Sequence, residues 1–85
     1  MKKVVIYSTE VCPYCVRAKK LLESKGVSFE DLRIDEDPKL RDDAVHKSGG
    51  RMTVPQIFIG DVHVGGCDEL YALERNGKLD PLLND

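Results

Sequence analysis

Residues 4–24 read VVIYSTEVCPYCVRAKKLLES, an apolar run that leads through a short polar loop into a helical pattern. The β-branched run predicts a buried strand over residues 3–7. Pro13 suits the first turn of a helix, where its missing N–H is not needed. Lys25-Gly26 predicts the end of that helix. The helix would bury the apolar positions Cys15, Ala18, Leu21 and Leu22.

The rest of the chain divides into further strands and helices. Strands are expected over residues 27–34, with a bulge or strand end near Glu30-Asp31, and over 54–59 and 62–64, joined by a Gly60-Asp61 hairpin turn. One helix begins at Asp37-Pro38 and ends at residues 48–50, and its buried stripe is Leu40, Ala44 and Val45. Another covers residues 68–74, stops at Asn76-Gly77 and is followed by a last turn at residues 80–83.

This order of elements predicts one α/β domain over residues 1–85. The first two strands are joined through a helix and are therefore expected to be parallel, with a right-handed crossover. The last two strands form an antiparallel hairpin. A four-stranded mixed sheet with helices on its faces, a three-layer α/β/α sandwich, is the expected architecture.

Composition excludes several classes of protein. Thirteen Lys and Arg against fifteen Asp and Glu give a net charge of −2, which argues against a nucleic-acid binder. No apolar run approaches the ~20 residues of a membrane span, so no membrane partner is expected. The apolar run after Met1-Lys2-Lys3 is too short for a signal-peptide core, which indicates a cytoplasmic protein.

The three cysteines are Cys12, Cys15 and Cys67, an odd number that does not fit a secreted disulfide scaffold. In a reducing compartment a C-x-x-C pair is either half of a metal site or a redox couple. Zinc would need four ligands, and His63 with Cys67 has a tolerable spacing. Gly65-Gly66 lies inside that second pair, however, so redox chemistry is favoured and no metal is expected. His46 and His63 are interpreted as solvent-facing.

Cys12 at the start of the helix has the properties of an attacking thiolate. The unpaired N–H groups of the first helical turn and the helix dipole favour a negative charge on its sulfur. Cys15 lies about one turn further and is expected to be more buried. Cys12 is therefore predicted to attack a disulfide and Cys15 to resolve the mixed disulfide that results.

Cys12-Pro13-Tyr14-Cys15, followed by Thr53-Val54-Pro55 and by Gly65-Gly66-Cys67-Asp68, closely resembles the glutaredoxins, in particular their small bacterial dithiol class. Thioredoxins carry Gly-Pro between their cysteines, whereas this chain has Pro-Tyr. The resemblance implies a thioredoxin fold and glutathione-dependent thiol–disulfide exchange. It implies glutathione as co-substrate, with no permanently bound cofactor.

The same resemblance implies a glutathione site. A cis bond before Pro55 would leave the Val54 backbone free to pair with the cysteine of glutathione, with Thr53 beside it. Gly66, Cys67 and the N-terminus of the following helix would receive the γ-glutamyl carboxylate, and Asp68 its ammonium. Tyr14 would lie along the tripeptide. Pro55 as the mere start of an edge strand is the alternative.

One position departs from the family pattern. Thr9 stands where the family usually has a lysine that binds the glycine carboxylate of glutathione. Arg41 and Arg51 are the candidate substitutes, although an extra glycine at Gly49-Gly50 lengthens the loop before Arg51. Because one exposed ion pair contributes only ~0–1 kcal/mol, the change need not abolish function. Cys67 is interpreted as a small residue near the cleft rather than a third redox partner.

The expected partners are glutathione and disulfide-bonded or glutathionylated proteins, ribonucleotide reductase among the candidates, and the expected state is a monomer. Two alternatives remain open. Some relatives share an iron–sulfur cluster between two subunits, which Pro13 disfavours. Other glutaredoxin-like proteins are reduced by thioredoxin reductase. Thr9 favours this alternative, whereas Pro13-Tyr14 and residues Gly65 to Asp68 disfavour it.

Overall fold

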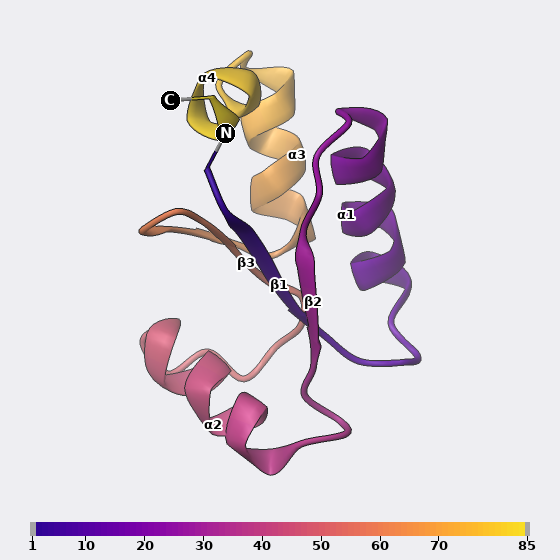
Figure 1. The fold of residues 1–85 in the computed structure, drawn as a ribbon, viewed down its shortest axis with the longest axis vertical. Coiled ribbons are helices and arrows are strands. Elements are labelled where there is room, and N and C mark those ends of the chain that lie inside the picture. The colour runs from indigo at the N-terminus through magenta and orange to yellow at the C-terminus, as the bar shows by residue number, and fades with distance from the viewer. Residues whose placement is uncertain (1, 85) are drawn as a thin grey trace.

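A computed structural model describes residues 2–84 as four strands and four helices around one sheet (Figure 1). In chain order the elements are β1 (Val4–Ser8), α1 (Pro13–Ser24), β2 (Glu30–Arg33), α2 (Pro38–Lys47), β3 (Gln56–Ile59), β4 (Val62–Gly65), α3 (Cys67–Arg75) and α4 (Leu79–Leu83). Within the described residues, no helix combines the length and the apolar character needed to cross a bilayer.

The sheet has the order β2-β1-β3-β4 and is mixed, as the sequence predicts. β1 and β2 run parallel, whereas β1 with β3 and β3 with β4 run antiparallel. Tyr7 near the end of β1 pairs with Gln56 at the start of β3. The segments that follow β1 and precede β3 therefore lie at the same end of the sheet.

Alternating side chains of β1 pack on opposite faces of the sheet, one covered by α1 and α3 and the other by α2. Val4 and Ile6 face the main core, where they join Ala18 and Leu22 of α1 and Leu70 of α3. In Figure 1, α1 and α3 lie side by side, and α2 stands apart from them across the sheet. The three-layer α/β/α arrangement is thus confirmed. α4, expected as a last turn, adds the buried Leu79 and Leu83 to this core.

Tyr7 points to the opposite layer, beneath α2. It is only 2% exposed, its ring meets Phe58 edge-on, and its hydroxyl accepts a hydrogen bond from Lys47 Nζ at 3.3 Å. Of the expected stripe on α2, only Ala44 is fully buried, and Leu40 and Val45 are half-buried. α2 therefore contributes little buried apolar surface to this layer.

Several of the bounds expected from the sequence were wrong in detail. β1 covers Val4–Ser8 rather than residues 3–7, and β4 extends to Gly65. β2 begins at Glu30, where its pairing with Val5 of β1 starts, and the Val27 N–H instead ends α1 through a hydrogen bond to Leu22 O at 3.1 Å. β3 begins two residues later than expected because a cis peptide bond precedes Pro55. α3 begins at Cys67 rather than at Asp68.

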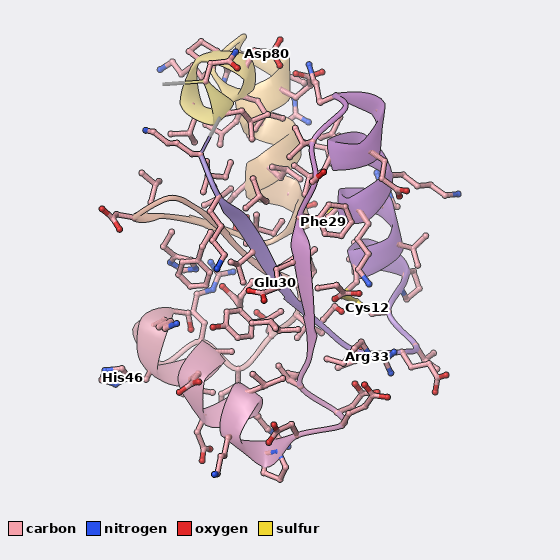
Figure 2. All side chains as sticks on the ribbon, in the orientation of Figure 1. Cys12, Phe29, Glu30, Arg33, His46 and Asp80 are labelled. Carbon is pink, nitrogen blue, oxygen red and sulfur yellow. A yellow bond between two sulfur atoms is a disulfide. The ribbon has the colours of Figure 1, made fainter. Side chains whose placement is uncertain are left out.

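His63 is half-buried rather than solvent-facing. Its Nε2 lies 2.7 Å from Gln56 Oε1, and its ring stacks on Phe58 with centroids 4.8 Å apart. His46 is exposed as expected and projects outward from α2 in Figure 2.

Leu22 supplies a test of the core. It has no exposed surface and packs with β1 and α3, so Leu22→Ala should lower the free energy of unfolding by about 2–5 kcal/mol in urea denaturation. Val16 on the same helix is 47% exposed, and Val16→Ala should change that free energy by less than about 0.5 kcal/mol. Equal effects of the two substitutions would contradict this core.

Candidate active site

The Cys12 sulfur caps helix α1. Cys12 has extended backbone angles (φ −151°, ψ 96°), and its Sγ accepts a hydrogen bond from Cys15 N at 3.1 Å. This is the position from which a Ser or Asp oxygen normally caps a helix. Pro13 follows at the first helical position, where it has no N–H to leave unpaired. The helix N-terminus therefore favours negative charge on this sulfur.

Cys12 and Cys15 are joined in a disulfide, with their Cα atoms 5.2 Å apart. Figure 2 shows the sulfur of Cys12 at the N-terminal end of α1. Cys12 is 8% exposed and Cys15 only 1%. The more accessible cysteine is the one at the helix cap, as an attacking group requires, and the sulfur of the more buried cysteine is bonded to it.

Asp35 anchors the loop that leads to Cys12. Its Oδ2 accepts the backbone N–H of Glu10 at 3.1 Å, and its carboxylate takes two hydrogen bonds from Arg33 at 2.9 and 2.7 Å. The Arg33 guanidinium holds the pKa of Asp35 down at about 2. The carboxylate is therefore charged at neutral pH and links the end of β2 to the active-site loop.

The Val54–Pro55 bond is cis, as expected from the resemblance. Beside it lies a hollow of about 140 Å³. Its walls come from three places: one of the two residues between the cysteines, the segment before β3, and the start of α3. They are Tyr14, Arg51, Thr53, Val54, Pro55, Gly66, Cys67, Asp68 and Glu69. Eight of these nine residues are candidates from the sequence.

Glu69 is the ninth, and sequence reasoning missed it. Its Oε1 accepts the Gly66 N–H at 2.8 Å and meets Arg51 Nη1 at 3.2 Å. The Gly66 N–H, with Arg51 as a smaller contribution, lowers the pKa of Glu69 below its ordinary value. The available signal was the position of Glu69 three residues after the N-cap glycine, where Glu commonly completes a capping box.

Gly65 permits the turn into α3. Its φ is +111°, which other residues rarely adopt, and a Cβ there would lie 2.5 Å from Glu69 Oε1 and 3.1 Å from Arg51 Nη1. A side chain at this position would displace the pair formed by Arg51 and Glu69. The glycine therefore shapes the wall of the hollow.

Arg41 lies outside this hollow. It lines a neighbouring one of about 220 Å³ together with Thr9, Ile34, Asp35, Met52 and Val54. Val54 belongs to both hollows, so the two adjoin at that residue. Of the two arginines proposed from the sequence, Arg51 lines the same hollow as the start of α3. Arg41 lines the same hollow as Thr9.

Metal-ligating side chains do not gather in the described part of the chain. Over residues 2–84, no three His, Cys, Asp or Glu side chains are grouped as a cation site would require. His63, the nearest candidate to Cys67 in sequence, is engaged with Gln56.

Cys67 is a free thiol at the start of α3, 4% exposed, and burial raises its pKa above the ordinary value. Iodoacetamide at pH 8 should therefore alkylate Cys67 in the oxidised protein at least about tenfold more slowly than in the urea-unfolded protein, because thiolate and access are both reduced. Peptide mass spectrometry measures both rates. Equal rates would contradict the burial of this thiol.

Known proteins match this chain over nearly its whole length in sequence. The family model described as Glutaredoxin matches residues 4–64. A glutaredoxin of Pseudomonas aeruginosa is 58% identical over 84 residues, covering 99% of each chain. Glutaredoxin 3 of Escherichia coli K12 is 59% identical over 83 residues, covering 98% of this chain and 99% of the relative.

Solved structures of glutaredoxins have the same fold as this chain. The crystal structure of a buckwheat glutaredoxin–glutathione complex superposes with a TM-score of 0.87 at 34% identity, covering 96% of this chain and 76% of that one. The fold predicted from the sequence, the thioredoxin fold of this family, is thereby confirmed.

Proposed function

This chain belongs to the glutaredoxin family, a family of thiol–disulfide oxidoreductases, and we propose that it uses glutathione to reduce mixed disulfides and protein disulfides. The observation that carries the proposal is the position of the Cys12 sulfur, which caps α1 at Cys15 N. A resolving sulfur lies within bonding reach. The domain that performs this chemistry spans residues 1–85.

Glutathione would bind with its cysteine against Val54. β3 pairs with β1 only from Gln56 onward, so the Val54 backbone lies before the start of the sheet ladder and can pair with an added strand. The hollow that Tyr14 and Thr53 border would receive the γ-glutamyl half. This arrangement brings the glutathione sulfur toward Cys12.

The two ends of the tripeptide have different partners in this proposal. At the γ-glutamyl end, the N–H groups of Cys67 and Asp68 at the start of α3 would bind the carboxylate. The carboxylates of Asp68 and Glu69 would face the ammonium. Arg51 adds a positive charge there. At the glycine end, Arg41 in the adjoining hollow supplies the cation that Thr9 lacks.

The monothiol route uses Cys12 alone. Its thiolate attacks the glutathione sulfur of a mixed disulfide, the bond to the substrate sulfur breaks, and the substrate leaves as a thiolate that takes a proton from water. Glutathione is then bonded to Cys12. A second glutathione thiolate attacks the sulfur of that bound glutathione, releasing glutathione disulfide and the Cys12 thiolate.

The dithiol route uses both cysteines. Cys12 attacks a protein disulfide and forms a mixed disulfide with one of its sulfurs. The Cys15 thiolate then attacks the Cys12 sulfur, which releases the reduced protein and leaves the Cys12–Cys15 disulfide of this structure. Two glutathione molecules reduce that disulfide in turn.

Cysteine substitutions separate the two routes. Cys12→Ser should abolish turnover of a small glutathione mixed disulfide and of a protein disulfide, because both routes begin at this sulfur. Cys15→Ser should keep at least about a third of the mixed-disulfide turnover and lose protein-disulfide reduction. A coupled assay with glutathione reductase measures both substrates. Full activity of the Cys12 variant would refute the assignment of the nucleophile.

Arg41 can be tested separately at the glycine end. Arg41→Ala should raise KM for the glutathione mixed disulfide about two- to fivefold with little change in kcat, because one exposed ion pair contributes only ~0–1 kcal/mol. Lys39→Ala removes an exposed positive charge from the same helix outside both hollows and should leave KM unchanged. Equal shifts in the two variants would exclude a specific role for Arg41.

The proposal also covers the oligomeric state, the compartment, the protein substrates and the source of electrons. The chain would act as a monomer in the reducing cytoplasm, on glutathionylated or disulfide-bonded proteins such as ribonucleotide reductase. Glutathione is preferred over thioredoxin reductase as the source of electrons. Faster reduction of the Cys12–Cys15 disulfide by thioredoxin reductase than by glutathione would reverse that preference.

A further inference from the structure

Gln56 and His63 are polar residues on the sheet face that α2 covers. Gln56 is the partner of Tyr7 across β1 and β3, and His63 is the partner of Phe58 across β3 and β4. Gln56 is only 1% exposed and His63 is half-buried. Burying an amide costs free energy unless its donors and acceptors are paired, so the partners of this amide determine what it does.

Both ends of the Gln56 amide have partners. Its Nε2 donates to Thr53 O at 2.9 Å and lies 3.2 Å from Thr53 Oγ1. Its Oε1 lies 2.7 Å from His63 Nε2, and the His63 ring is itself stacked on Phe58. A chain of hydrogen bonds therefore runs from β4 through Gln56 to Thr53, in the segment that lines the active-site hollow.

The Thr53 carbonyl determines which way the amide faces. A carbonyl oxygen only accepts hydrogen bonds, so the Gln56 atom beside it must be the nitrogen. The Gln56 oxygen therefore faces His63, and His63 Nε2 must carry a hydrogen in order to donate to it. His63 thus holds the amide in one of its two orientations.

This orientation also determines the role of the Thr53 hydroxyl. The Gln56 nitrogen has two hydrogens, one for Thr53 O and one for Thr53 Oγ1. A hydroxyl oxygen that accepts from Gln56 keeps its own hydrogen for another acceptor. Because Thr53 is exposed and lines the hollow, that acceptor can come from a bound ligand.

We propose that Gln56, oriented by His63, is a positioning residue that makes the Thr53 hydroxyl a hydrogen-bond donor to an oxygen of the γ-glutamyl half of glutathione. This inference rests on the proposed function, since it concerns how glutathione is recognised at that site. Gln56 does not itself line the hollow, so it acts through Thr53. The γ-glutamyl half suits a donor, because it presents carboxylate and carbonyl oxygens.

The contribution of this hydrogen bond falls on binding. The Thr53 hydroxyl would contact the γ-glutamyl half and not the reacting sulfurs, so the bond is present both before and during the attack by Cys12. An interaction that is equal in the ground state and the transition state lowers KM without raising kcat. Its loss should therefore appear in KM.

Two mixed disulfides of 2-thiopyridine test this proposal. One contains glutathione, and the other contains cysteinylglycine, which lacks the γ-glutamyl half. In both, the Cys12 thiolate attacks the peptide sulfur, the disulfide bond breaks, and the pyridinethiolate leaves, takes a proton from water and is followed by its absorbance. Initial rates with the reduced protein give KM and kcat for each substrate.

Gln56→Met keeps the length of the side chain and removes the amide. It should raise KM for the glutathione substrate about three- to tenfold with kcat unchanged, and keep kcat/KM for the cysteinylglycine substrate within about twofold of wild type. Thr53→Val should raise KM for the glutathione substrate by the same factor, and the double variant should stay within about twofold of either single variant. Additive losses, or an equal loss with the truncated substrate, would show that Gln56 only supports the fold and would overturn the proposal.

Two further substitutions separate the hydrogen-bond chain from general stability. Ile59→Val is the matched control, because Ile59 is buried at the other end of the same strand, where it pairs with Val4. It should lower stability in urea and leave both KM values unchanged. Gln56→Glu keeps the size of the side chain but places an acceptor beside Thr53, which draws the hydroxyl hydrogen away from the ligand. It should raise KM for the glutathione substrate at least as much as Gln56→Met, and a wild-type KM would overturn the proposal.

The wild-type protein provides a test that needs no variant to fold. Nitrogen NMR at pH 8, where an ordinary imidazole is neutral, should show the hydrogen of His63 on Nε2. A hydrogen on Nδ1 with Nε2 bare would mean that the Gln56 oxygen faces Thr53, and would overturn the proposal. No turnover of the glutathione substrate by wild type would instead overturn the proposed function itself.

Discussion

A sulfur atom in place of an oxygen at a helix cap is the constraint on which this site depends. The Cys15 N–H points at Cys12 Sγ, so the hydrogen bond that begins α1 also orients the reactive atom. A helix N-terminus favours the charged form of its cap, and for a cysteine that form is the nucleophile. Local folding and chemical reactivity therefore have the same cause. Pro13 supports both, because it suits the first helical position.

The sheet order then brings the other parts of the site to this cap. β1 and β3 are antiparallel neighbours, so the loop after β1 and the cis-proline segment before β3 meet at one end of the sheet. β4 returns antiparallel to β3 and places Gly65 opposite Ile57, so α3 begins at that same end. Three segments that are distant in sequence thus surround one hollow. The Cys12 cap, the cis bond before Pro55 and the N-terminus of α3 are each local features. The strand order brings them together at one end of the sheet.

Much of this arrangement could be predicted because its causes are local. The helix caps at Cys12 and Asp37 and the hairpin at Gly60-Asp61 follow from residue type and spacing, and the structure has them. The extent of β2 could not be predicted, because it depends on where the pairing with β1 begins, at Glu30 and Val5, while the Val27 N–H ends α1. The burial of His63 depends on Gln56 and Phe58, which only the fold places beside it. The capping box that Glu69 forms with Gly66 is local, whereas its pairing with Arg51, eighteen residues away in sequence, depends on the fold.

The acidity of Cys12 in the reduced protein tests the central claim most directly. The rate of carboxymethylation at Cys12, resolved from Cys15 and Cys67 by peptide mass spectrometry, can be followed from pH 4 to pH 10. A thiolate stabilised by the start of α1 predicts a titration midpoint at least one unit below the ordinary cysteine value of about 8.5. A midpoint at or above that ordinary value would show that the helix cap does not activate this sulfur, and would contradict the account.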